Sequence, residues 1–433
     1  MAPLAAALML TSCPVELPVN ASIAFPCDSD QDCLSGQVCR GHLCLYADAG
    51  AGHRDAGAPD LAGRDLASRD LAGADLNQPD GAGFDRAPID AGAWWNADWH
   101  RRRKLTFDNA GRNETLLDFP VLVKLDDSRI DYDRTTGDGI DVRFVDADGS
   151  ELYFQLESWI PDDTSWFWVK VPRIEALAAN DFIWLYYDNP GATARSEQSL
   201  TWSGGYQAVY NMHYNFYDSS GHIVDPAYDN RTGPGSGQIA GARTFDGTES
   251  WIDLGDNLPI LQSVSAVTLS AWIHPNRLVA EQTIVAIGVH SSSAPTPEAR
   301  AFLSLRNSSV AVGGRASDSE GQRDIVGSSR AVEAGGWYHV VGVIDFASGE
   351  ASLYVNSVRN AQGPLALAQS ATANTTASNG AIGARADGQS QLFSGIIDDV
   401  RVSGVARSGI WIGAEYENQA LDSFIDYGGE ESR

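Results

Sequence analysis

Two adjacent carboxylates stand inside the segment FSGIIDDVRVSG, residues 393–404. Its apolar alternation predicts a β-strand, whose successive side chains point to opposite faces of a sheet. Asp399 then shares a face with Arg401 and can pair with it, whereas Asp398 falls in an apolar row with Ile396. A buried carboxylate without a partner costs several kcal/mol. Asp398 is therefore a candidate catalytic acid, metal ligand or structural hydrogen-bond acceptor.

The sequence carries none of the common catalytic signatures. It has no Gly-x-Ser-x-Gly elbow, no His-Glu-x-x-His motif and no phosphate-binding loop. The glycine-rich GPGSG at 233–237 lacks the Lys-Ser/Thr that such a loop requires, and is interpreted as a turn. His339 alternates with apolar residues, which favours a core histidine over a general base. We expect no enzymatic activity.

Two strand-like segments alternate aromatic and polar side chains in a way that suits a sugar. In VTLSAWIHP, residues 267–275, Trp272 and His274 share a face with hydroxyl side chains, and Tyr354 alternates with Asn356. The C–H face of a pyranose can stack on an indole while polar neighbours meet its hydroxyls. Trp272, His274 and Tyr354 are therefore the candidate ligand-binding residues. The alternative is that both strand faces are buried and Trp272 belongs to the core.

Calcium is the one cofactor for which the sequence offers ligands. Asp246 of the segment FDG and Asp398 are the candidates, since calcium prefers oxygen ligands. Aspartates are also frequent between 126 and 148, but the EF-hand template fails there, because its sixth position counted from Asp131 is Thr136 rather than glycine. Those aspartates are interpreted as turn residues.

The N-terminus has the features of an export signal. Residues 1–13 read MAPLAAALMLTSC, an apolar run too short to span a bilayer. The run resembles a bacterial lipoprotein signal, in which a lipobox is cut just before its cysteine, although the usual Lys or Arg before the run is missing. The resemblance implies a signal peptide at 1–12, a lipidated Cys13 and a lipid-anchored protein at the cell surface or outer membrane.

Within the segment 13–45, four more cysteines crowd into eighteen residues, at Cys27, Cys33, Cys39 and Cys44. An even set in an exported chain predicts two disulfides, with three connectivities open. A four-cysteine zinc site is the alternative, but the spacing is wider than that of zinc knuckles.

Residues 46–92 are rich in Asp, Ala and Gly, and aspartate recurs at every fifth residue from Asp55 to Asp90. A period of five matches neither a helix nor a strand. Three prolines interrupt the segment, which disfavours a pentapeptide-repeat β-helix, and a disordered acidic linker is predicted. The net charge of −27 argues against nucleic acid or an anionic membrane surface as a partner, since both require a basic face.

From residue 93 the pattern becomes strand-like. FPVLVKL places four apolar residues on one face, and DADGS at 146–150 predicts a hairpin turn. No helical periodicity intervenes, so residues 93–200 are predicted to form an antiparallel β-sandwich. The segments GIDVRFVDADG, WFWVKVP and LYYDNPGA resemble a bacterial domain family of unknown function that sits just before laminin-G-like domains on exported proteins.

Residues 201–433 carry a second resemblance. ARTFDGTESWIDL, VTLSAWIHP, GGWYHVVGVIDF and FSGIIDDVRVSGVARS occur in the order seen in laminin-G-like, concanavalin A-like jelly rolls. The resemblance implies two antiparallel sheets, one of them concave, and a chiefly structural acidic pair, with calcium near the rim in some relatives. Glucanases of this superfamily carry Glu-x-Asp-x-Glu on one strand, and no Glu-x-Asp occurs here. SGIWIGAEYENQ predicts a short helix packed on the sandwich.

Together these patterns predict an all-β, exported lipoprotein with two β-sandwich domains after a small disulfide-rich segment and a linker. Its expected function is non-catalytic recognition of an extracellular glycan or a surface protein through the jelly roll. Two alternatives stay open, because a fold does not confer a function. One is a structural, self-associating envelope scaffold, and the other is a polysaccharide-acting enzyme with an unrecognised site.

Overall fold

The computed structural model describes residues 37–40, 43–46 and 93–433, without 162, 196, 214–215, 223, 256–257, 259, 262–263, 291–298, 315–323, 366–377, 386–387 and 389. The chain divides into two compact units, Met1–Ala87 and Pro88–Arg433. Among the residues so described, no helix is long and apolar enough to cross a membrane.

The first unit contributes one hairpin. Strands β1 (Gln37–Arg40) and β2 (Leu43–Tyr46) pair antiparallel, with Cys39 opposite Cys44 in the register. Only the backbone of these two cysteines is described. The predicted signal peptide at 1–12, Cys13, Cys27, Cys33 and residues 47–92 of the predicted linker lie outside the described residues.

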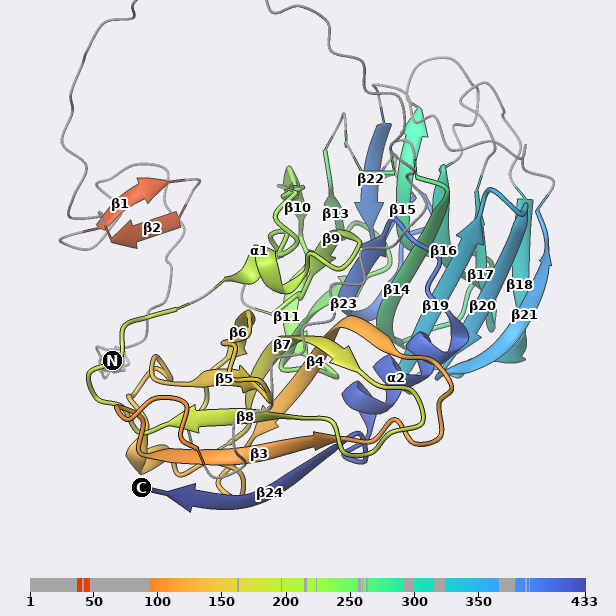
Figure 1. The fold of residues 1–433 in the computed structure, drawn as a ribbon. Coiled ribbons are helices and arrows are strands. Elements are labelled where there is room, and N and C mark those ends of the chain that lie inside the picture. Colours follow the sequence, from red (N-terminus) through yellow and green to blue (C-terminus); the bar gives the residue numbers. More distant parts are fainter. Residues whose placement is uncertain are drawn as a thin grey trace, which may run out of the picture. The chain divides into compact units, whose positions relative to one another are not determined.

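The second unit begins with an antiparallel β-sandwich, the first sandwich (Figure 1). One sheet has the strand order β24-β3-β8-β5 and the other the order β4-β7-β6. The strands are β3 (Arg101–Phe107), β4 (Leu116–Leu125), β5 (Arg143–Asp146), β6 (Phe154–Ser158), β7 (Ser165–Ile174), β8 (Phe182–Tyr187) and β24 (Ile425–Ser432).

Alternating apolar side chains fill the space between these two sheets. The four apolar residues of FPVLVKL lie in this core, as their spacing predicts: Phe119, Val121, Val123 and Leu125. The predicted tight turn is also present, because the Asp146 N–H donates to the Ser150 carbonyl at 2.8 Å. The two strands that flank this turn nevertheless belong to different sheets, because β5 pairs with β8 and β6 pairs with β7. They therefore do not form a hairpin with each other.

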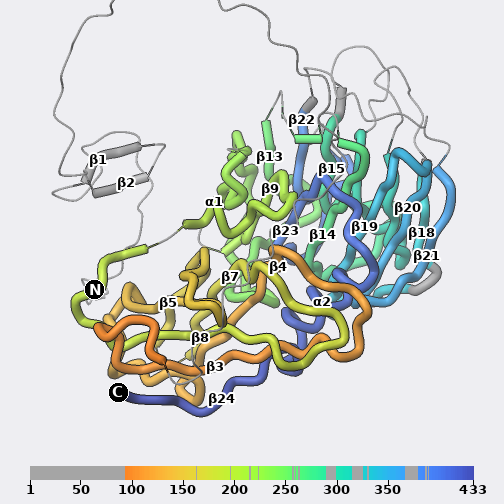
Figure 2. The backbone as a smooth tube through the Cα atoms, viewed as in Figure 1, coloured from red at the N-terminus to blue at the C-terminus, as the bar shows by residue number. Residues whose placement is uncertain are grey.

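The C-terminal strand returns to the first sandwich. β24 pairs antiparallel with β3, with Ile425 opposite Phe107 and Tyr427 opposite Leu105 (Figure 2). The prediction that residues 201–433 form the second sandwich alone is therefore corrected at its end. A pairing between strands so far apart in the chain leaves no local sequence signal, because it depends on which sheet edge is free.

The second sandwich has two larger sheets. Their orders are β10-β13-β22-β15-β16-β17-β18 and β11-β12-β23-β14-β19-β20-β21, with β9 also paired to β23. The strands of the first of these sheets are β10 (Tyr228–Asn230), β13 (Trp251–Asp253), β15 (Gln282–His290), β16 (Ala301–Arg306), β17 (Ser309–Gly314), β18 (Asp324–Ala331) and β22 (Ser378–Ile382). Those of the second are β9 (Tyr206–Tyr210), β11 (Gly233–Ser236), β12 (Gly241–Asp246), β14 (Ala266–Pro275), β19 (Tyr338–Asp345), β20 (Glu350–Val355), β21 (Val358–Pro364) and β23 (Ser394–Ser403). The predicted all-β fold with two sandwiches is confirmed.

The predicted C-terminal helix forms as α2 (Gly409–Ala420) and contacts both sandwiches. Ser408 caps it, since its hydroxyl accepts a hydrogen bond from the Trp411 N–H. Trp411 and Ala414 pack into the core of the first sandwich, whereas Ile412 packs on the second. The other helical segments are the short α1 (Gln198–Thr201) and the 3-10 turn η2 (Tyr132–Arg134).

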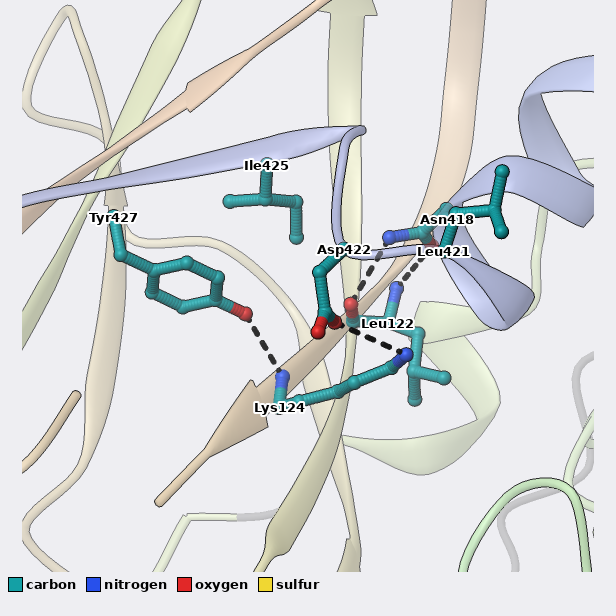
Figure 3. A pocket seen from close by; sticks show the side chains of 7 residues that line it. All are labelled: Leu122, Lys124, Asn418, Leu421, Asp422, Ile425 and Tyr427. Atoms are coloured by element: carbon teal, nitrogen blue, oxygen red, sulfur yellow. Dashed lines mark hydrogen bonds and ion pairs between the residues drawn. The ribbon is translucent and has the colours of Figure 1, made fainter. Parts of the chain in front are cut away.

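A small hollow marks the point where the chain passes from α2 to β24 (Figure 3). The Asn418 amide both accepts from the Leu122 N–H and donates to its carbonyl, and the Tyr427 hydroxyl accepts from the Lys124 N–H. The Lys124 ammonium pairs with Asp422 at 3.5 Å. The hollow has room for about one water molecule. We interpret it as a packing feature rather than a ligand site.

Candidate functional site

The strand that holds the acidic pair contains a β-bulge. Ser270 pairs with Arg401 and Trp272 with Asp398, so one residue of β14 faces two residues of β23 between them. Asp399 takes up the extra length with a φ of +48°. Strict alternation therefore holds from Ile396 to Asp398 but fails beyond the bulge, because Val400 and Val402 lie in the core. Asp398 and Arg401 instead share the face that points away from the core.

Asp398 is fully buried and fastens a loop. Its Oδ2 accepts a hydrogen bond from the Ile239 N–H at 2.9 Å. The approach is so close that a Cβ on Gly237 would lie 2.5 Å from this oxygen, which explains the glycine there. Burial, together with the charge of Asp399, raises the pKa of Asp398 well above its usual value. The arrangement is that of a structural acceptor.

Replacing Asp398 with alanine is expected to lower the free energy of unfolding by about 1–3 kcal/mol, because the buried Ile239 N–H loses its acceptor. Urea denaturation of the variant measures this, with the exposed Asp127→Ala as the control. A calcium ligand would behave differently: calcium would raise the melting temperature of the wild type over that in chelator, and the variant would lose the increase.

The second candidate metal ligand, Asp246, is exposed and organises a turn. Its Oδ1 accepts hydrogen bonds from the backbone N–H groups of Thr248, Glu249 and Ser250. Slight desolvation opposes ionisation, but these bonds outweigh it and lower the pKa of Asp246 to about 2. Asp246 pairs with Ser394, four residues before Asp398, so the backbone positions of the two aspartates are about 13 Å apart along the strand direction. The described part of the chain holds no cluster of three His, Cys, Asp or Glu suited to a metal.

A buried ionic cluster occupies the interface between the sandwiches. The Arg401 guanidinium pairs with Asp399 at 2.7 Å and with Glu415 of α2 at 2.8 Å. It also lies 4.2 Å from the ring centroid of Trp168 and 4.7 Å from that of Trp202. Trp168 belongs to β7 of the first sandwich, and Trp202 follows α1, which contacts β6 and β7, whereas Arg401 comes from β23 of the second sandwich. The cation therefore ties both sandwiches and the helix together.

Glu157 of β6 is a further acid at this interface. It accepts a hydrogen bond from the Asn211 side chain, and its Oε1 lies 3.9 Å from His213 Nδ1. Burial, reinforced by the charge of Asp399, raises the pKa of Glu157 to about 8. The carboxyl is thus protonated over much of the neutral range.

The predicted binding residues Trp272 and Tyr354 lie under α2. Trp272 is only 2% exposed and donates its indole N–H to the Gln419 side chain. It lies between His339 and Tyr416, with ring centroids 5.1 and 5.8 Å away. Tyr354 is 7% exposed and packs with Ile412. The prediction that Trp272 and Tyr354 bind a ligand is contradicted, because the helix occupies this face of the sheet.

His339 is buried in the same cluster, as expected of a core histidine. Burial and the nearby Arg401 charge lower the pKa of His339 to about 3, so the imidazole is neutral. Its Nε2 lies 3.9 Å from Glu415. No substrate can reach the ring, which leaves it without a role in acid–base catalysis.

The third candidate, His274, lies on a strip of this sheet that α2 leaves open. The strip, called here the open strip, is a contiguous row of half-buried residues: Thr244, Ile396, His274 and Trp337. The rings of His274 and Trp337 meet edge to face, 5.4 Å apart. The buried Nδ1 of His274 has no hydrogen-bond partner among the described residues. Trp337, which sequence reasoning did not select, is the half-buried aromatic beside it.

The sequence and structure were compared with known proteins. Residues 138–224 match a domain of unknown function (DUF2341), and residues 246–413 match the concanavalin A-like lectin/glucanases superfamily. No curated protein matches the chain.

Solved structures resemble about half of this chain. Domain 4 of AbnA, an extracellular arabinanase from Geobacillus stearothermophilus solved with arabinotriose, is 21% identical, with a TM-score of 0.34 over 48% of this chain and 96% of its own. A SAP-like pentraxin from Limulus polyphemus is 14% identical, with a TM-score of 0.32 over 43% and 92%. The receptor-binding domain of botulinum neurotoxin mosaic serotype C/D is 15% identical, with a TM-score of 0.38 over 50% and 51%.

The family matches agree with the order of the two sandwiches and with the all-β fold. The chain therefore carries a domain of the concanavalin A-like lectin/glucanases superfamily, preceded by a DUF2341 domain.

Proposed function

We propose that this protein is a non-catalytic binding protein that recognises an extracellular glycan or a surface protein from a lipid-anchored position at the cell surface. The observation that supports binding is the open strip. There a half-buried indole, Trp337, stands against an imidazole whose Nδ1 lacks a partner among the described residues. A half-buried indole beside a half-buried imidazole is a pairing that can orient a sugar ring or a polar side chain.

Burial of the acids supports the absence of catalysis. Asp398, Asp399, Glu157 and Glu415 all lie inside the interface between the sandwiches, where they bind backbone or side-chain partners of the chain itself. A glycosidase needs two carboxyl groups that flank a bound substrate. These four do not meet that requirement, because a polysaccharide cannot enter a closed domain interface.

The lipid anchor rests on the N-terminal sequence. A lipidated Cys13 would hold the chain on the membrane, and the acidic segment up to residue 92 would act as the spacer. Both sandwiches would then be presented away from the surface.

Replacing Trp337 with alanine is expected to weaken binding to the cognate ligand at least tenfold, since an aromatic anchor at a contact surface is commonly worth about 1.4 kcal/mol or more. The measurement is co-sedimentation of the purified protein with insoluble polysaccharides and envelope fragments, with calcium or with chelator. His274→Ala should weaken binding in the same assay. Tyr228→Ala removes an exposed aromatic from the other sheet and should leave binding unchanged.

The result is informative only if the variants stay folded, so the melting temperature of each is measured in parallel. If Trp337→Ala and His274→Ala were retained on the polysaccharide as strongly as the wild type, binding would lie elsewhere. That result would contradict the proposal for the open strip. An oligomer in sedimentation without any ligand, together with no retention, would favour the self-associating scaffold instead.

A further inference from the structure

The outer face of the four-stranded sheet in the first sandwich carries an uninterrupted set of aromatic residues. The core takes Leu105 and Phe107 from β3 and Ile183 and Leu185 from β8, so the alternate residues point outward. Those alternate residues are Arg102 and Lys104 on β3 and Phe182, Trp184 and Tyr186 on β8. Strands β3 and β8 lie side by side (Figure 1), and in their register Lys104 stands opposite Trp184 and Arg102 opposite Tyr186. The segment that precedes β3 adds Trp94, Trp95 and Trp99 to this cluster.

Arg102 holds two of these indoles in place. Its guanidinium lies 3.9 Å from the ring centroid of Trp184 and 4.6 Å from that of Trp94. A 2.7 Å ion pair with Glu431 of β24 and a hydrogen bond to the Ala93 carbonyl fix the guanidinium in turn. Trp94, Trp184 and Phe182 remain half-buried, so each keeps part of its ring accessible. We call Trp94, Arg102, Lys104, Phe182 and Trp184 the tryptophan face.

Lys104 supplies a cation without an anion. The chain has three lysines, and the other two form ion pairs: Lys124 with Asp422 and Lys170 with Asp118. Within the described residues, Lys104 has no ion pair, and its ammonium lies 3.8 Å from the ring centroid of Phe182. The ring of Phe182 stands nearly perpendicular to that of Trp184, at 85° with ring centroids 5.9 Å apart. An ammonium that lies over the Phe182 ring and has no carboxylate partner among the described residues is positioned to receive one from outside.

A bulge in β24 keeps the space beside Lys104 open. The register of β24 against β3 shifts between Tyr427 and Glu430, which places Gly428 and Gly429 at the level of Lys104. These glycines contribute no side chain, and a Cβ added to Gly429 would meet no atom within 4 Å. Glycine in a strand allows another molecule to approach the backbone closely. A sugar over Trp184 would therefore have room to extend toward β24.

We propose that the tryptophan face binds an acidic polysaccharide, with a pyranose ring stacked on the accessible part of Trp184 and a sugar carboxylate paired with the Lys104 ammonium. The charge complementarity is local: one sugar carboxylate meets one cation, the Lys104 ammonium. A nucleic acid would instead require several neighbouring cations to neutralise its phosphates, and Arg102, the other cation of the tryptophan face, is already paired with Glu431. The proposal does not depend on the open strip, which lies on the second sandwich.

The test uses the full-length protein and three immobilised uronate polysaccharides, namely polygalacturonate, alginate and hyaluronate, each beside its methyl-esterified form. We expect the wild type to bind at least one of the three polysaccharides in its free-acid form. Binding to the methyl-esterified form of the same polysaccharide should be at least tenfold weaker. Lys104→Met should bind the free acid no better than the ester. Trp184→Ala should lose binding at least tenfold, and Lys170→Met, which removes a different lysine charge, should bind like the wild type.

Trp184 also packs on Arg102, so Trp184→Phe is included as a variant that keeps a ring, and all melting temperatures are recorded. Three results would overturn the proposal: no binding to any of the three acids, equal binding of acid and ester, or full binding by Lys104→Met. Loss of binding in Trp337→Ala while Trp184→Ala binds normally would assign the glycan to the open strip and also reject the tryptophan face.

Discussion

Replacing Arg401 with methionine is expected to lower the free energy of unfolding by about 3–5 kcal/mol, the range found when one partner of a buried ion pair is removed. The variant would leave Asp399 and Glu415 buried without the cation that both contact. It would also remove the cation that packs against the rings of both Trp168 and Trp202. Urea denaturation followed by tryptophan fluorescence measures the loss.

Two comparisons separate the ionic cluster from a simple change of volume. Arg134→Met removes an exposed arginine and should change stability by less than about 0.5 kcal/mol. The triple variant Arg401→Met, Asp399→Asn, Glu415→Gln removes the uncompensated charges and should recover part of the loss. If Arg401→Met were as stable as Arg134→Met, the cluster would not fasten the interface.

Replacing Glu157 with glutamine is expected to change how stability depends on pH. The folded protein raises the pKa of Glu157 from its ordinary 4.5 to about 8, chiefly through burial. The proton is therefore bound more tightly in the folded state, so the stabilisation is complete below pH 4.5 and is lost as pH rises through 8. Glutamine mimics the protonated acid and cannot ionise.

The wild type should accordingly lose on the order of 3 kcal/mol between pH 5 and pH 9 through this one group, at most about 1.4 kcal/mol per pH unit. The variant should show a correspondingly flatter profile and a higher melting temperature at pH 9. Burial raises the pKa of Asp398, Asp399 and Glu415 as well, so some decline remains in the variant. Parallel profiles for wild type and Glu157→Gln would show that Glu157 ionises without cost in the folded state.

Both effects come from one structural fact: the face of the second sandwich that carries Arg401 and Trp272 is a domain interface. Helix α2 lies on it, with Trp411 and Ala414 facing the first sandwich and Ile412 the second. Asp398 and Trp272, which the sequence offers as candidate site residues, are therefore buried in this interface. Surfaces for a ligand are found beside this interface, at the open strip, and on the tryptophan face.

Local patterns in the sequence determined much of the fold. The alternation in FPVLVKL depends only on the two-residue period of a strand, and Phe119 and Val121 do face the core. The turn at 146–150 follows from aspartate and glycine preferences, and Ser408 caps the helix that the C-terminal pattern predicts. The two domain resemblances also match the families found along the chain.

Only the tertiary structure decided where the acids and aromatics point. The bulge at Asp399 depends on how β23 pairs with β14 and brings Arg401 to the face of Asp398, which strict alternation cannot anticipate. The burial of Trp272 depends on α2 lying across the sheet. The position of β24 depends on the free edge of the first sandwich at β3. These are long-range pairings, whose free energy comes from surfaces far apart in the chain, so no local run of residues encodes them.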